Sequence, residues 1–413
     1  MQVKFDSKEK LMKTLSTTLL LLVTCFSTSM LFSQASAQTE TEPSQQAETE
    51  IRQPPDATVL EADQWTKVDA SVERALTWLA SQQQADGSFR SIDVGQPAIT
   101  SFCLMAFLAQ GASPANGQYQ QELGDAIDFI VDQQKANGLI STRAPDGVPI
   151  PRDVEHYKIG APSVYNHAIS ALALCEAYGQ CNPEQAKRLA PVIEKAIAAT
   201  LEMQGWGPKP EWAEGGWRYL DTKFDLDADL SVTGWQLMFL RSAKNAGFEV
   251  PQKSVKTAVK YIKTCFLKDK DRQVYVYMAG VREASTRAMA GAGVLAMAHA
   301  GEHESEEAIA SGEWILKHDF KEYNKDTPIY GARWAPDRYH YGCFLCTQAM
   351  FHLGGKYWEQ FFPPLVETLL ANQRDDGSWP PEKYDKQFGN CYSTSLCILS
   401  LSAPNQMLPI LQR

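Results

Sequence analysis

From about residue 65 to residue 404, segments with two different patterns of hydrophobic and polar positions follow one another in turn. In the first pattern, Ala75, Trp78, Leu79 and Gln83 share one face of an amphipathic helix. In the second, stretches such as "ITSFCLMAFLAQG" are apolar nearly all round, as expected for a fully buried helix. A turn containing glycine separates the two kinds of segment, so the pattern predicts hairpins of one outer and one inner helix.

This hairpin pattern recurs six times, at a spacing of roughly fifty to seventy residues. Its recurring positions are Trp78, Gln83, Gly87, Phe89, Gln134, Gln204, Gln373, Gly377 and Trp379. Phe266 and Phe320 take the glutamine position in units four and five. We expect the glutamine amide to satisfy backbone groups at a helix end and to hold each hairpin to its neighbour.

Six stacked hairpins form either an open solenoid or a closed ring. The first and last units match each other best, and neither has the polar outer face of a capping repeat. The sequence therefore predicts an all-α fold, a single (α/α)6 toroid over residues 64–405 with a C-terminal tail at 406–413. The inner helices are expected to form a barrel; the open solenoid is the alternative.

The first 37 residues have the features of a secretory signal peptide. Lys4, Lys8, Lys10 and Lys13 precede the apolar run "LLLLVTCFSTSMLF", and "ASA" ends at Ala37. We expect cleavage after Ala37, then a flexible tether over 38–63 that is rich in Glu, Gln, Thr and Pro. The mature chain is expected to be secreted or periplasmic and not transmembrane. The alternatives are an uncleaved anchor and a lipoprotein site at Cys25.

The charge balance disfavours one class of partner. The chain carries a formal net charge of −10 and no stripe of clustered Lys and Arg. Nucleic acids and anionic membranes need such a stripe, so neither is an expected partner. The expected partner is a small apolar ligand or another protein.

The first unit resembles the QW motif of squalene and oxidosqualene cyclases, which is a basic, a small, an aromatic and an aliphatic residue followed by Gln, Gly and an aromatic. Arg74, Ala75, Trp78 and Leu79 match its first half, and "Q…G.F" from Gln83 to Phe89 matches its second half. Protein prenyltransferase beta subunits are similar in the same way. The stretches "SVTGWQLMFLRSAKNAG" and "TQAMFHLGG" also resemble exported prenyltransferase-like proteins of planctomycete-type bacteria. The resemblance covers about residues 65–404 and implies a terpenoid cyclase-like toroid, but no particular chemistry.

The resemblance to class II terpene cyclases implies a catalytic acid in "FDLDADLSVTGW". Asp227 and Asp229 match the first two positions of an Asp-x-Asp-Asp motif, with Asp229 as the proton donor. Leu230 replaces the last Asp, and a lone Asp at a helix start is commonly an N-cap. Both roles therefore stay open for Asp229.

The metal and cysteine candidates are weaker. Prenyltransferases bind zinc through Asp-x-Cys and His; here the candidates are His340, Cys343 and Cys391, but Gly389 stands where the Asp belongs. Cys343 and Cys346 form a C-x-x-C, for which core packing competes with a redox role. No cofactor is predicted.

Equivalent positions in the repeat suggest two disulfides in an exported chain. Cys103 and Cys397 occupy the same place in the first and sixth inner helices, which become neighbours if the ring closes. Cys175 and Cys181 flank the turn at Gly179.

Aromatic residues near the starts of the inner helices are the predicted ligand-binding groups. They are Tyr165, Trp217, Tyr219, Trp235, Tyr339 and Tyr392. Three functions remain open: a prenyltransferase- or squalene-cyclase-like protein with a cavity for an isoprenoid or other apolar ligand, a protein-binding toroid, and a carbohydrate-active α/α-barrel enzyme. The last needs paired carboxylates, for which the sequence offers Asp227, Asp229 and Asp337.

Overall fold

A computed structural model describes residues 59–224, 227–281, 284–325 and 336–413, which belong to one compact unit. The predicted signal peptide, most of the predicted tether and Trp334 of the fifth repeat lie outside these residues.

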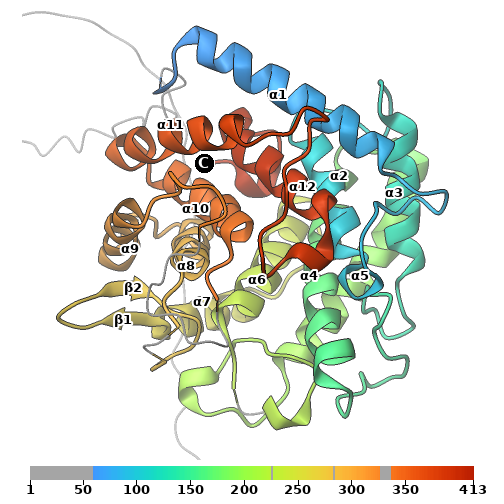
Figure 1. The fold of residues 1–413 in the computed structure, drawn as a ribbon. Helices are drawn as coiled ribbons and strands as arrows, with labels where there is room; N and C mark the ends of the chain where they lie inside the picture. The colour runs from blue at the N-terminus through green and yellow to red at the C-terminus, as the bar shows by residue number, and fades with distance from the viewer. Residues whose placement is uncertain (1–58, 225–226, 282–283, 326–335) are drawn as a thin grey trace, which may run out of the picture. The chain divides into compact units, whose positions relative to one another are not determined.

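The described residues form six hairpins of an outer and an inner helix (Figure 1). The outer helices are α1 (Ala62–Ser81), α3 (Gln120–Asp132), α5 (Pro183–Gln204), α7 (Gln252–Thr264), α9 (Glu306–Lys317) and α11 (Gly355–Ala371). The inner helices are α2 (Ala98–Leu108), α4 (Ala161–Tyr178), α6 (Leu230–Asn245), α8 (Arg287–His299), α10 (Tyr339–Leu353) and α12 (Asn390–Leu401). The remaining elements are short.

The short elements lie in the connections. One antiparallel pair, β1 (Phe266–Lys268) and β2 (Gln273–Tyr275), follows α7. The single-turn helices are Asp93–Gly95, a π-helix at His156–Gly160, Glu211–Ala213, Thr222–Phe224, Lys386–Phe388, Ala403–Asn405 and Pro409–Leu411.

The inner helices close into a ring. Each packs on the next, from α2 through α4, α6, α8 and α10 to α12, and α12 packs on α2. Figure 1 shows the N-terminal helix α1, in blue, beside the red helices α11 and α12 of the last unit, which it also contacts. The predicted (α/α)6 toroid is therefore confirmed, and the open solenoid is excluded.

The repeated glutamines join consecutive hairpins. The side-chain N–H2 of Gln83, Gln134, Gln204 and Gln373 donates to the carbonyl of the glycine in its own turn at 2.9–3.3 Å. The same nitrogen donates to a carbonyl of the next outer helix at 2.8–2.9 Å; these acceptors are Glu122, Val192, Ser254 and Ser71. The last contact, from unit six to unit one, closes the ring.

Unit four uses a different link where phenylalanine replaces glutamine. Arg287, at the start of α8, is buried and forms an ion pair with Asp337. Its guanidinium also donates to the carbonyls of Asp319 and Lys325 in unit five, and it lies 3.9 Å over the ring of Phe320. A buried, fully bonded arginine thus does the joining that the amide does elsewhere.

Both ends of the toroid extend beyond the predicted boundaries. α1 begins at Ala62 and Leu60 is already buried, so ordered structure starts inside the expected tether. At the other end the expected tail packs on α6, because Leu408 and Ile410 are apolar and buried. The N–H of Ile410 donates to the buried carboxyl of Glu176 on α4 at 3.2 Å.

None of the described helices is both long enough and apolar enough to cross a bilayer.

The turn glycine of unit six yields a first prediction. Gly377 has φ +92°, and a Cβ there would lie 2.6 Å from the carbonyl oxygen of Arg74 in α1. Gly117 has a similar φ of +98° with nothing within 4 Å, so it is the matched control. Gly117→Ala is expected to cost about 1 kcal/mol of strain, whereas Gly377→Ala is expected to cost about 1–3 kcal/mol more through overlap. Urea unfolding checks this; equal losses would contradict the close approach.

The buried carboxyl of Glu176 yields a second prediction. Burial raises its pKa to about 7, against about 4.3 for an exposed Glu, although the hydroxyl of Ser242 and the N–H of Ile410 donate to it. The folded state therefore keeps this proton longer than the unfolded state. The contribution of this carboxyl to stability is greatest below pH 4.3 and falls by on the order of 3 kcal/mol as the pH rises to about 7.

Glu176→Gln is expected to flatten this pH dependence of the melting temperature. Glu184→Gln, on an exposed residue of α5, is the control and should keep the wild-type slope. The same slope in both variants would show that Glu176 is not the titrating group.

Candidate functional site

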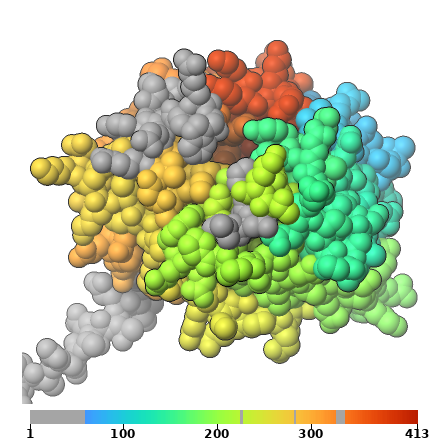
Figure 2. All heavy atoms as spheres, turned by 90° about the horizontal axis from the view of Figure 1, so that it is seen from below, coloured from blue at the N-terminus to red at the C-terminus, as the bar shows by residue number. Residues whose placement is uncertain are grey.

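A cavity of about 590 Å³ lies at the end of the barrel where the inner helices begin. Every inner helix contributes to its wall, through Ala98, Tyr165, Ser231, Ala288, Tyr341 and Tyr392. Figure 2 views the toroid after a quarter turn from Figure 1, with the lime and yellow connections of units three and four next to each other. They are bonded there, since the N–H of Leu230 donates to the carbonyl of Tyr277 at 2.8 Å.

Aromatic rings make up much of the described wall. They are Phe102, Tyr157, Tyr165, Tyr219, Trp235, Tyr277, Tyr341, Phe388 and Tyr392. Trp235 stacks on Tyr341 and meets Phe102 edge-on, with ring centroids 6.2 and 5.6 Å apart. Such packing holds the aromatic faces in fixed positions around the cavity.

The polar atoms of this aromatic wall bond to one another. The hydroxyl of Tyr165 donates to Ser231 at 3.0 Å, and Ser231 lies 3.1 Å from the hydroxyl of Tyr341. The indole N–H of Trp235 donates to Tyr341 at 2.8 Å. Burial raises the pKa of Tyr341 to about 12, so its hydroxyl stays neutral. The polar atoms in this part of the cavity are therefore uncharged and hydrogen-bonded to one another.

Four of the six predicted aromatic residues line the cavity, namely Tyr165, Tyr219, Trp235 and Tyr392. Trp217 does not; it is fully buried, and its indole N–H donates to the carbonyl of Thr200 in its own outer helix at 2.8 Å. Tyr339 is also fully buried, and its hydroxyl donates to the carbonyl of Phe320 at 3.2 Å. Neither of these two residues is part of the cavity lining.

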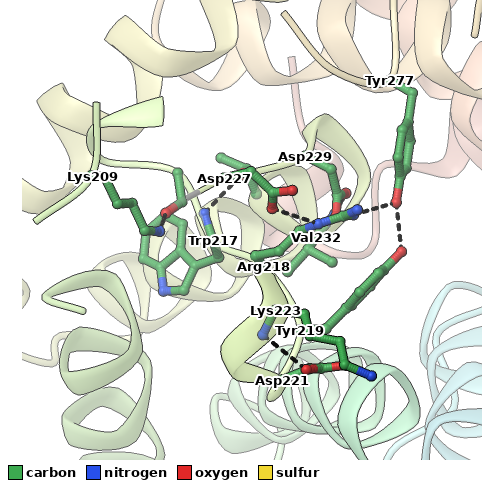
Figure 3. Close-up of polar contacts among 12 residues, drawn as sticks. Lys209, Trp217, Arg218, Tyr219, Asp221, Lys223, Asp227, Asp229, Val232 and Tyr277 are labelled. Carbon is green, nitrogen blue, oxygen red and sulfur yellow. Dashed lines mark hydrogen bonds and ion pairs between the residues drawn. The ribbon is translucent and has the colours of Figure 1, made fainter. Parts of the chain in front are cut away.

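Asp229 lies outside the cavity wall and is engaged twice (Figure 3). One carboxylate oxygen accepts the N–H of Val232 at 2.8 Å and so caps α6. The other pairs with Arg218 at 2.5 Å. The guanidinium of Arg218 also pairs with Asp227 at 2.8 Å and donates to the hydroxyl of Tyr277 at 2.5 Å.

This network does not suit Asp229 for protonating an alkene. Burial raises the pKa of the Asp229 carboxyl, while Arg218 and the N–H of Val232 oppose that rise by stabilising the carboxylate. A proton donor needs an oxygen open to the substrate, whereas Asp229 is fully buried with both oxygens bonded. The N-cap alternative from the sequence therefore fits the structure, and Asp227 is the partly exposed second partner of the same arginine.

Side chains already occupy the positive ends of several inner helices. The first N–H groups of α2, α6, α8 and α10 donate to side-chain oxygens. The acceptors are one amide and three carboxylates: Asn166, Asp229, Asp337 and Glu382. These caps occupy N–H groups that would otherwise be available to bind an anion in the cavity.

The weak metal candidates do not form a site. Among the described residues, no group of three or more His, Cys, Asp or Glu side chains could hold a metal ion. His340, Cys343 and Cys391 therefore do not form such a group. Burial raises the pKa of Cys343 and Cys346 well above the ordinary thiol value, which disfavours thiolate redox chemistry.

The predicted disulfides are absent from the described residues, where all eight cysteines are free. Cys103 and Cys397 do lie on adjacent helices, but the thiol of Cys103 points to the carbonyl of Cys391 at 3.8 Å. Cys181 is only partly buried, and Cys175 faces the core.

The sequence analysis missed the charged pair on the cavity wall. Arg338 directly precedes α10, and Asp385 precedes the short helix before α12; the two form an ion pair. The position of Arg338 is like that of the aromatic candidates, because it also lies at the start of an inner helix. Asp385 lies in a loop without periodicity, where no sequence signal marks it.

Comparisons with known proteins agree with the fold. No family model and no curated protein sequence matches the chain. Among solved structures, a variant of the type II terpene cyclase MstE from Scytonema, in complex with geranylgeranyl dihydroxybenzoate, is similar with a TM-score of 0.52 at 13% identity, covering 84% of this chain and 100% of the cyclase.

Two carbohydrate-active proteins share the same architecture. A glycosidase variant matches with a TM-score of 0.53 at 11% identity over 85% of this chain and 100% of its own. An alpha-amylase from Clostridium perfringens matches with a TM-score of 0.50 at 12% identity over 80% and 97%. At these identities the likeness shows the fold alone. The chain has the all-α toroid fold that the cyclase, glycosidase and amylase structures share.

Proposed function

We propose that the toroid binds an isoprenoid or another elongated apolar molecule in its central cavity. The observation that carries the proposal is the aromatic wall around about 590 Å³, a volume within the roughly 300–1,000 Å³ range of small-molecule sites. Burial of a ligand's apolar surface against these fixed rings supplies the free energy of binding. With the predicted signal peptide, the ligand would be met outside the cytoplasm.

The proposal is a binding function without proton-initiated cyclisation. The carboxyl that the sequence nominated as the acid is committed to Arg218 and to the α6 N-terminus. Among the described residues of the wall, Asp385 is the one carboxylate, and it is paired with Arg338. Terpene cyclisation by Asp229 therefore has no geometric support.

The two alternatives fit the cavity less well. A glycoside hydrolase needs two carboxyl groups flanking one bond, whereas Asp227, Asp229 and Asp337 are all tied to arginines outside the described wall. A toroid that only displays a protein-binding face needs no hollow, and its barrel would be expected to be filled.

Filling the cavity tests the binding proposal. Ala288 lies on the wall in the first turn of α8, so Ala288→Phe places a ring in the ligand's space without removing a structural side chain. We expect the native protein to bind a C15–C20 isoprenoid in fluorescence titration, and Ala288→Phe to weaken binding at least tenfold with little change in circular dichroism. Ala70→Phe, on an exposed position of α1, should bind as the native protein does. Failure of the native protein to bind any such molecule would overturn the proposal.

The variant Asp229→Asn distinguishes a structural role of Asp229 from a role as a catalytic acid. Asp229→Asn keeps a cap acceptor but removes the ion pair, leaving Arg218 with Asp227 alone. Breaking a buried pair costs roughly 3 kcal/mol, so the urea midpoint should fall while isoprenoid affinity of the folded variant stays within about twofold. Asp227→Asn, on the partly exposed side of the network, should cost less. Loss of an observed cyclase activity without loss of stability would instead make Asp229 the acid.

A further inference from the structure

We infer that the ligand of this cavity is a neutral long-chain alcohol, whose hydroxyl is held by Arg338 and Asp385, and not a prenyl diphosphate. The inference rests on the proposed function and specifies the polar end of the ligand. It depends on three observations: an unsatisfied buried oxygen, the charge of the wall, and the capped helix ends.

The buried oxygen belongs to Asp385. This residue is fully buried and lines the cavity, and its Oδ1 accepts a hydrogen bond from Nη1 of Arg338. Among the residues that the structure describes, its Oδ2 has no hydrogen-bond partner, and neighbouring atoms enclose this oxygen. Buried carboxylate oxygens normally bond to several donors, so an unpaired one in a residue of the cavity lining would be stabilised by a ligand donor that reaches it.

The second half of the site is a donor. The side chain of Arg338 is 36% exposed and lines the same cavity; its Nη1 bonds to Asp385 and to the carbonyl of Tyr384 at 3.3 Å. A guanidinium carries five N–H donors, so donors remain on the wall beside the unpaired oxygen. A hydroxyl donates one hydrogen bond and accepts others, and this adjacent donor and acceptor match it.

The charge of the wall decides between an alcohol and an anion. Within the part of the wall that the structure describes, Arg338 and Asp385 are the charged residues, and they cancel. A diphosphate would lose its hydration without gaining an uncompensated cation, and it would meet the Asp385 carboxylate. The carboxylates that cap α6, α8 and α10 also occupy N–H groups that would otherwise donate to an anion.

A pure hydrocarbon would fit the rings but would leave Oδ2 of Asp385 unpaired. A charge-assisted hydrogen bond to the alcohol should therefore favour it over the matching hydrocarbon by about tenfold.

Three C15 probes with the same chain test the inference on the full-length protein: farnesol, farnesene and farnesyl diphosphate. Isothermal titration calorimetry is expected to give farnesol the tightest binding, with farnesene about tenfold weaker and the diphosphate weaker by tenfold or more. Asp385→Asn leaves Arg338 uncompensated, so it should weaken farnesol and strengthen the diphosphate, which narrows or reverses their ratio.

Two further variants distinguish a change in ligand preference from a loss of folding. Arg338→Gln leaves Asp385 negative and should weaken the diphosphate further, opposite to Asp385→Asn. Asp128→Asn breaks an exposed ion pair with Arg188, away from the cavity wall, and should change no ratio. Melting curves identify any variant that fails to fold. If only one of the two variants folds, its shift in the ratio of farnesol to diphosphate affinity is compared with the ratio of the native protein.

The outcomes separate this inference from the binding proposal. Equal affinity for farnesol and farnesene, or a preference for the diphosphate in the native protein, would overturn the alcohol site and leave apolar binding intact. If none of the three probes binds, the proposed function and the alcohol site both fail.

Discussion

The whole architecture depends on one repeated contact, the glutamine amide that bonds to the turn glycine and to the next outer helix. A two-helix hairpin cannot bury its own apolar face, so each unit is stable only with its neighbours in a fixed place. The amide sets that place, because its nitrogen satisfies two carbonyls at once. The turn that accepts this bond needs glycine, because a Cβ at Gly377 would overlap the carbonyl of Arg74. The contact from Gln373 to Ser71 turns a stack into a ring.

Ring closure creates the cavity and also determines its electrical character. Six inner-helix starts converge on one space, which would be strongly positive if their N–H groups were unsatisfied. Carboxylates such as Asp229 and Glu382 accept those N–H groups, and Arg218 and Arg287 in turn neutralise Asp229 and Asp337. Charges are thus paired behind the wall, while aromatic rings face the hollow. An apolar ligand is compatible with that arrangement, and a highly charged one is not.

The sequence predicted the fold because the repeat depends on residues with strict geometric requirements, namely the glutamine that bonds to the turn and the glycine in that turn. It predicted the site less well, because orientation within a helix turn depends on packing. Tyr339 and Tyr341 are two residues apart, about 200° around α10, so the second faces the cavity and the first faces the core. Trp217 lies off the cavity wall, and its indole N–H donates to a carbonyl of its own hairpin, as that of Trp379 does. Asp385 lies in an aperiodic loop, and only the folded ring brings it to Arg338.

The network around Asp229 gives this carboxylate a structural role at the start of α6. An acid strong enough to protonate an alkene must be protonated and exposed to it. In this chain Leu230 occupies the next position and Arg218 holds the carboxylate in an ion pair, so the group that would supply the proton instead fixes the start of α6. Tyr277 and Tyr219, whose hydroxyls lie 2.5 Å apart, connect this network to the cavity wall. The acidic residues therefore hold Arg218 and the start of α6, whereas the rings and the Arg338–Asp385 pair are what a ligand would contact.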